Sequence, residues 1–201
     1  MPALLQKPAV RRLCPALLAA LLVAAPQQAR ADLTEFVDED YYTATVTPGG
    51  TALAALNAAS PVKQDGKVFH GNTKWVIEWR ITTAMQPNGR CRITKRTVMV
   101  TTTITLPKLV GGTSKQQQAF ERFLPALKTH ERGHHAIGKD AGLMLDWRLA
   151  ALPDMEDCKQ LEARANETGR KTIAEYAERD RRYDATTEHG KSQGAVFVEP
   201  G

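Results

Sequence analysis

Cysteine is scarce in this chain of 201 residues, with three in total. None of the three stands in a Cys-x-x-Cys pair, the spacing with which cysteines most often bind structural zinc. Cys14 belongs to the N-terminal segment, which leaves Cys91 and Cys158 as an even pair in the rest of the chain. If the chain is exported, we expect these two to form one disulfide, and two free buried thiols are the alternative.

Long apolar runs and internal repeats are missing too. The one marked apolar run, residues 15–25, follows a basic start and is too short to favour a membrane-spanning helix. Together with the small-x-small sequence at residues 29–31, it predicts a secretory signal peptide over residues 1–31, with a membrane anchor as the alternative. The remaining segment, 32–201, is about 170 residues long, which suits a single domain with its own core.

A strong excess of one charge sign is also absent outside the predicted signal peptide. The chain has 27 Lys and Arg against 22 Asp and Glu. Residues 1–31 hold four of the basic residues and no acidic ones, so 27 − 4 = 23 basic residues remain against 22 acidic ones. This balance gives no indication of a nucleic-acid partner or of an anionic membrane surface.

Two β-patterned segments stand out in the first half of the chain. Residues 75–82 alternate, with Trp75, Ile77, Trp79 and Ile81 on one face, and we expect these tryptophans to pack in the core. A β-branched run over 92–106 follows a turn and predicts an antiparallel partner for the first strand. Weaker alternation near residues 41–46 predicts a further short strand, and the tail at 194–198 another at an edge.

The second half of the chain has helical periodicity. A capping-box pattern at 114–117 begins a helical run that ends near Pro153, and Pro125 is expected to break or kink it. Asp154 is the expected cap of a further helix, and residues 183–190 are expected to form a loop. Glycines at positions 133, 138 and 142 indicate a closely packed helix face. We therefore expect an α+β fold in which a hairpin or small antiparallel sheet packs against a bundle of helices.

The helical run contains the pattern His-Glu-x-x-His, formed by His130, Glu131 and His134. Residues four apart share one helix face, so the two histidines can present ring nitrogens to one metal ion. Glu131 lies one step round the helix, where it can act on water as a general base. Such sites most often bind Zn²⁺, with a third protein ligand and an open position.

Four residues compete as the third ligand. Asp140 and Glu167 have the spacings of two zinc-peptidase groups, but the glycine that would turn the chain toward Asp140 is replaced by Ile137, and Glu167 lies in a segment charged all round. His135 points about 100° away from His134 on a helix. The fourth candidate, His189, lies beyond the helices, and the nearby Asp184 can orient a ligand imidazole.

Several motifs resemble a bacterial family of predicted secreted zinc-dependent proteases, domain of unknown function 922. They are Cys91 before a β-branched strand, Leu106-Pro107 at its end, Leu127-x-x-His130-Glu131-x-x-His134, Cys158 in the following helix, and Tyr183-Asp184-x-x-Thr187-x-His189-Gly190. The resemblance spans nearly the whole of residues 32–201. It implies His189 as the third zinc ligand.

The resulting hypothesis is an exported zinc metalloprotease, periplasmic or secreted, that acts on protein or peptide substrates. Zn²⁺ would be held by His130, His134 and His189, with Glu131 as general base and Asp184 orienting a ligand. Tyr183 is either an oxyanion donor or a packing residue. A cell-wall amide hydrolase and a non-catalytic zinc-stabilised periplasmic binding module are the alternatives.

Overall fold

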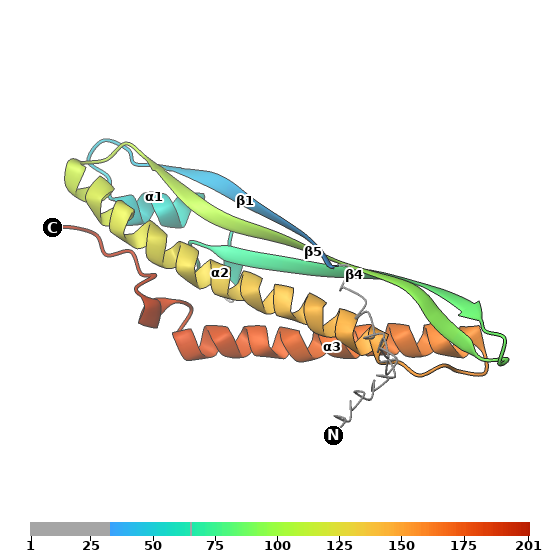
Figure 1. Ribbon diagram of the computed structural model, residues 1–201. Helices are drawn as coiled ribbons and strands as arrows, with labels where there is room; N and C mark the ends of the chain where they lie inside the picture. The colour runs from blue at the N-terminus through green and yellow to red at the C-terminus, as the bar shows by residue number, and fades with distance from the viewer. Residues whose placement is uncertain (1–32, 65) are drawn as a thin grey trace, which may run out of the picture. The chain divides into compact units, whose positions relative to one another are not determined.

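The computed structural model describes residues 33–64 and 66–201, so the expected signal peptide lies outside the described residues. The elements, in chain order, are β1 (Leu33–Thr45), α1 (Ala52–Ala59), β2 (Lys63–Gln64), β3 (Lys67–Val68), β4 (Asn72–Met85), β5 (Cys91–Val110), α2 (Ser114–Ala150), α3 (Cys158–Thr187) and a 3₁₀ turn, η1 (Lys191–Gln193) (Figure 1). The expected α+β class is confirmed.

The sheet has three strands in the order β1-β5-β4. Strands β4 and β5 form the expected antiparallel hairpin, with Trp75 opposite Thr102. Strand β1 pairs with the other edge of β5 in the parallel direction, so the sheet is mixed. The alternation near residues 41–46 predicted this strand correctly but shorter than it is, and alternation alone does not encode the direction of pairing.

Helices α2 and α3 lie on one face of the sheet (Figure 1). Two apolar clusters fix α2 along this face: Phe123 and Leu127 pack in one with Leu106 of β5, while Ala141 and Leu145 pack in the other. The second cluster also receives Trp75, Ile77, Trp79 and Ile81, which confirms their role in the core. The segment 130–134 lies between the two clusters, so both ends of this part of α2 are held against the sheet.

Three glycines let α2 approach its neighbours closely. A Cβ atom at Gly138 would collide with Trp75, and one at Gly142 with Val100 of the sheet. A Cβ atom at Gly133 would collide with the ring of Tyr183 on α3. The expected closely packed helix face is therefore confirmed.

Helix α2 runs without a break through Pro125, contrary to the expected break. Pro125 is exposed, so the backbone carbonyl that it leaves without an N–H donor can be hydrated. The predicted capping box is present one residue earlier than expected, with Thr113 as N-cap and Gln116 as its partner. The expected cap of α3 was wrong: Asp157 caps it, while the carboxylate of Asp154 pairs with Arg92.

The expected loop over residues 183–190 is largely helical, because α3 continues to Thr187 and ends at Glu188 in the left-handed conformation. Its threonine hydroxyls bond to backbone carbonyls one turn earlier, as from Thr187 to Tyr183, and so are compatible with a helix. The tail forms no strand among the described residues. Instead Phe197 is buried in the first cluster, and Glu199 accepts hydrogen bonds from the first N–H groups of α1.

Cys91 and Cys158 form the expected disulfide, with a Cα–Cα distance of 5.1 Å. It ties the start of β5 to the start of α3 and is compatible with an exported protein. None of the described helices combines the length and the apolar character that a membrane crossing requires.

Candidate metal centre

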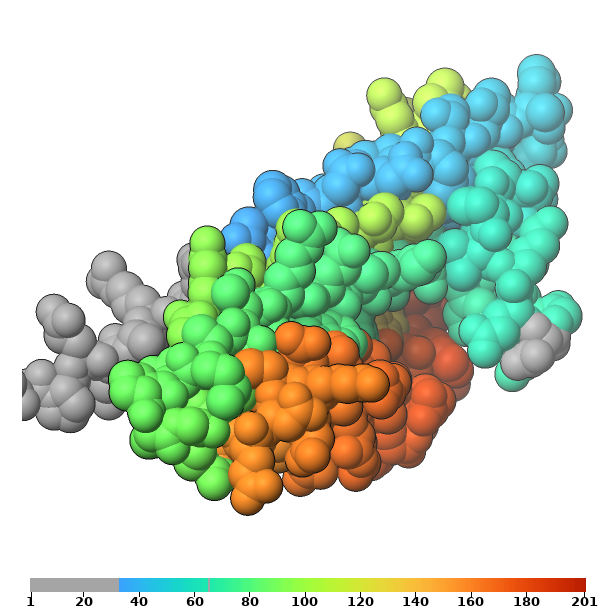
Figure 2. Space-filling view, turned by 90° about the vertical axis from the view of Figure 1, so that its right-hand side faces the viewer, coloured from blue at the N-terminus to red at the C-terminus, as the bar shows by residue number. Residues whose placement is uncertain are grey.

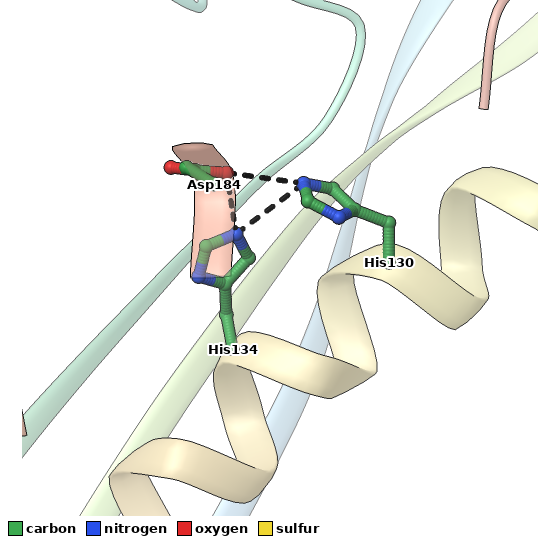
Figure 3. Close-up of side chains that lie close together, drawn as sticks. All are labelled: His130, His134 and Asp184. Carbon is green, nitrogen blue, oxygen red and sulfur yellow. Dashed lines mark hydrogen bonds and ion pairs between the residues drawn. The ribbon is translucent and has the colours of Figure 1, made fainter. Parts of the chain in front are cut away.

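The helical geometry of α2 brings the two histidines of His-Glu-x-x-His together. The rings of His130 and His134 are buried, and their Nε2 atoms lie 3.3 Å apart. The spacing of four residues on one helix produces this contact, as the sequence predicts. Both rings point from α2 toward the C-terminal end of α3 (Figure 3).

Asp184 completes the group from α3. Its Oδ1 atom lies 3.0 Å from His134 Nε2 and 3.3 Å from His130 Nε2 (Figure 3). Among the described residues, these three side chains form the one set of three or more that offers converging metal-binding atoms, all within 4.8 Å of one another. The set contains two imidazoles and one carboxylate.

The far side of each imidazole is held by a hydrogen bond. His134 Nδ1 donates to Asp180 Oδ1 at 2.8 Å, and His130 Nδ1 donates to Gln193 Oε1 at 3.0 Å. These partners fix the ring orientations and direct both Nε2 atoms toward Asp184. Metal-binding histidines in proteins have this same kind of support.

Glu131 is buried beside the cluster and is held by the sheet. Thr73 of β4 donates to Glu131 Oε2 at 2.7 Å, and Gly71 leaves room for the carboxylate, because a Cβ atom there would collide with it. Burial raises the pKa of Glu131 above its ordinary value, although the Thr73 hydrogen bond partly offsets the effect. A carboxyl group with a raised pKa is suited to general acid–base chemistry near neutral pH.

The charges of His134 and Asp184 stabilise each other. Burial of His134 opposes its positive charge, but the hydrogen bonds to Asp180 and Asp184 outweigh burial and raise its pKa to about 10. Burial likewise disfavours the charged form of Asp184, yet hydrogen bonds from His130 and His134 hold the pKa of this carboxyl well below its usual range. Without a metal, the cluster therefore retains a proton on His134 to balance the surrounding carboxylates.

Tyr183 packs against both histidines. Its ring stacks on His130 with a centroid distance of 5.2 Å and meets His134 edge-on at 4.9 Å. The hydroxyl donates to the backbone carbonyl of His130 at 3.2 Å and accepts from Gln193 at 3.0 Å. These contacts are those of a packing and positioning residue, and the oxyanion role stays a prediction.

His189 reaches the edge of the site. Its Nδ1 atom lies 3.5 Å from Asp184 Oδ1, and its side chain is 52% exposed. Its ring packs against Phe69 with a centroid distance of 4.9 Å. The converging set thus contains Asp184 where the sequence predicted His189, with His189 next to Asp184 at the rim.

The other third-ligand candidates lie elsewhere. Asp140 is exposed on α2, and Glu167 forms exposed ion pairs with Arg164 and Lys171. His135 contacts Thr102 of β5 and Glu35 of β1. None of the three belongs to the converging set.

Sequence reasoning missed the supporting residues Thr73, Asp180 and Gln193. A usable signal existed for Asp180, because Asp180 and Asp184 are four apart and would share one helix face if the helix continued through both. Thr73 and Gln193 lie far from His-Glu-x-x-His in the chain, and no local pattern indicated them.

The fold and the site together define a class: an α+β protein in which the His-Glu-x-x-His side chains of one helix are buried and meet a carboxylate from a second helix. The chain belongs to the family described as "Bacterial protein of unknown function (DUF922)", whose pattern covers residues 39–190. This membership confirms the resemblance to domain of unknown function 922, and the family description names no activity. Comparison with curated proteins found no match, and neither did comparison with solved structures.

Proposed function

We propose that this protein is an exported zinc-dependent hydrolase that cleaves peptide bonds, with Glu131 as general base. In this proposal His130, His134 and Asp184 hold the metal. The observation that carries the proposal is the convergence of their three donor atoms at separations of 3.0, 3.3 and 3.3 Å.

These separations suit zinc. Tetrahedral zinc has bonds of about 2.0–2.1 Å to His nitrogen and carboxylate oxygen, which puts neighbouring ligand atoms about 3.3 Å apart. Hydrogen bonds on the far nitrogens of both imidazoles further support a metal-binding role. Three protein groups leave one tetrahedral position for water or substrate, as in catalytic zinc sites.

Glu131 would do the proton chemistry. Bound zinc would supply Lewis acidity toward water and toward the substrate carbonyl. The Glu131 carboxylate accepts the proton of the attacking water and passes it to the leaving amine. Thr73 keeps one carboxylate oxygen in place, so the carboxylate is oriented before substrate arrives.

The Glu131 contacts favour an enzyme over a structural zinc module. A purely structural site is normally closed by four protein ligands and has no need of a further buried carboxylate. Here Glu131 is 3% exposed, directly follows His130 in the sequence, and lines a cleft. Burying such a carboxylate costs free energy, which a functional role would account for.

The test compares wild type with Glu131→Gln, both purified as residues 32–201 and loaded with zinc. We expect Glu131→Gln to keep stoichiometric zinc. Its activity on casein should fall by at least about a hundredfold, which is the lower end of what a general base contributes. Retention of zinc and of full activity by the variant would remove Glu131 as the base. Activity on peptidoglycan but not on casein would instead favour the cell-wall amide hydrolase.

A further inference from the structure

A cleft of about 420 Å³ opens beside the candidate metal centre. Residues 62, 64 and 68–73 form one side of it, and α2, the end of α3 and the C-terminal tail form the others. Figure 2 shows a recess between the cyan surface, residues 50–64 and 66–70, and the red-orange end of α3. Glu131 and the three converging side chains all line this cleft, so a substrate that lies in it can reach them.

Six large apolar side chains are among those that line the cleft, and together they are called its apolar arm. Leu127 lies one turn before His130 on α2, so this arm begins directly beside the candidate metal centre. The apolar arm comes from α1, from residues beside β2 and β3, from α2 and from the tail, and its residues are Leu53, Val62, Val68, Phe69, Leu127 and Phe197. Four separate parts of the chain thus supply large apolar side chains to one surface next to the reacting groups.

Carboxylate side chains also line the cleft. Glu131, Asp180 and Asp184 line it, and no Lys or Arg occurs among the described residues that line any part of the cleft. A substrate with a free C-terminal carboxylate beside the cleaved bond would need a cation to bind it. Among its described lining residues, the cleft therefore offers no Lys or Arg side chain that could bind such a carboxylate or an acidic side chain.

We propose that the cleft selects an internal segment of a peptide, with a bulky aliphatic or aromatic side chain next to the cleaved bond in the apolar arm. This inference rests on the proposed function and adds its substrate class. The protein is an endopeptidase with apolar specificity, and it does not remove single residues from a free C-terminus.

Blocked peptides test this specificity. The zinc-loaded protein is given a series with acetylated N-termini and amidated C-termini, in which one position beside the cleaved bond is Phe, Leu, Ala, Lys or Asp. We expect kcat/KM for Phe and Leu to exceed that for Lys and Asp by at least about tenfold, the usual contribution of an apolar pocket. A matched peptide with a free carboxylate one residue from the bond is expected to be cleaved at least about tenfold more slowly than its amide.

Two exposed valines provide a matched pair of variants. Val68 lines the apolar arm and is 37% exposed, whereas Val76 lies on β4 away from the cleft and is 46% exposed. We expect Val68→Lys to lower kcat/KM for Phe and to raise it for Asp, and Val76→Lys to change neither. Equal rates across the wild-type series, or equal effects of the two variants, would overturn the apolar specificity.

A binding measurement separates this inference from the proposed function. Titration calorimetry of the metal-free protein measures the affinity for the Phe and Asp amides without any chemistry. Preferential binding of Phe supports the apolar arm even if no peptide is cleaved, in which case the hydrolase proposal alone fails. Zinc-dependent cleavage that is abolished by Glu131→Gln but shows no preference for Phe would leave the hydrolase in place and overturn the specificity.

Discussion

At the scale of single residues, the chemistry of the site depends on which side chain completes the histidine pair. Asp184 has an oxygen within 3.3 Å of both Nε2 atoms, while His189 is half exposed and reaches only the rim. A carboxylate ligand reduces the net positive charge that the metal brings to the site, and a third imidazole would not. The identity of this ligand therefore affects how strongly the site can activate water.

Alanine variants distinguish the two candidates. Loss of a residue that only supports a ligand weakens metal binding by about ten- to a hundredfold. We expect Asp184→Ala to weaken zinc binding by more than about a hundredfold, and His189→Ala by less than about tenfold. Competition with a chromophoric chelator measures both affinities. The opposite ranking would restore the ligand set of three histidines that the family resemblance implies.

His134 makes the stability of the metal-free protein depend on pH. Its folded pKa of about 10 is above the ordinary value of 6.5 because of Asp180 and Asp184. A raised folded pKa contributes stability that is complete below pH 6.5 and is lost as pH rises through about 10. Zinc binds the deprotonated ring, so the loaded protein does not depend on that proton.

We therefore expect the difference in Tm between zinc-loaded and metal-free protein to widen from pH 7 to pH 10. Scanning calorimetry at both pH values measures it. Asp180→Asn keeps a hydrogen-bond acceptor but removes one charge, so the widening should shrink in this variant. A difference in Tm that is constant across this range would contradict the assigned role of the His134 proton.

At the scale of elements, the sequence predicted best where periodicity is strong. Alternation over 75–82 identified the β4–β5 hairpin and the face that is buried, because one side of that strand carries only large apolar residues. The contact between His130 and His134 was likewise predictable, because it follows from their spacing of four residues on one helix. Local patterns suffice when the contacts they imply are local.

The end of α3 was predicted poorly for a physical reason. Threonine and glycine over 183–190 are typical of a loop, yet contacts with α2 stabilise the helix through Thr187. Tyr183 packs on the His130 ring, and Asp184 meets both imidazoles. These tertiary contacts outweigh the weak local propensity, and they also place Asp184 in the converging set.

Packing between α2 and α3 at Gly133 can be tested by substitution. A methyl group at this position would collide with Tyr183, so we expect Gly133→Ala to lower the free energy of unfolding by about 1–3 kcal/mol despite the higher helix propensity of Ala. Urea denaturation measures the loss. In a Tyr183→Ala background the same substitution should lower the free energy of unfolding much less. An unchanged loss would show that Tyr183 is not the obstacle.

At the scale of the whole molecule, the site depends on parts that are far apart in sequence. Helix α2 supplies two of the converging groups, α3 supplies the third, β4 holds Glu131 through Thr73, and η1 holds His130 through Gln193. The α2–α3 pair therefore has to keep its register for the three donor atoms to meet. The disulfide ties α3 to β5 instead, at the end of α3 that lies away from the site.

The disulfide should accordingly affect stability without affecting metal binding. Cys91 and Cys158 are separated by 67 residues, and closing a loop of that size stabilises a fold by about 4 kcal/mol. Cys158 and Asp184 are 26 positions apart on α3, or about 39 Å along the helix. We expect the double variant Cys91→Ser/Cys158→Ser to lose stability of that order in urea denaturation.

The zinc affinity of the same variant is measured well below its unfolding midpoint. We expect it to stay within about threefold of wild type, because packing near the other end of α3, and not the disulfide, positions the donor atoms. A large loss of zinc affinity in a variant that is still folded would mean that the bridge sets the register of α3 along its whole length. The two measurements together therefore show whether α3 is positioned locally, by Tyr183 and Asp184 against α2, or from its distant covalent anchor.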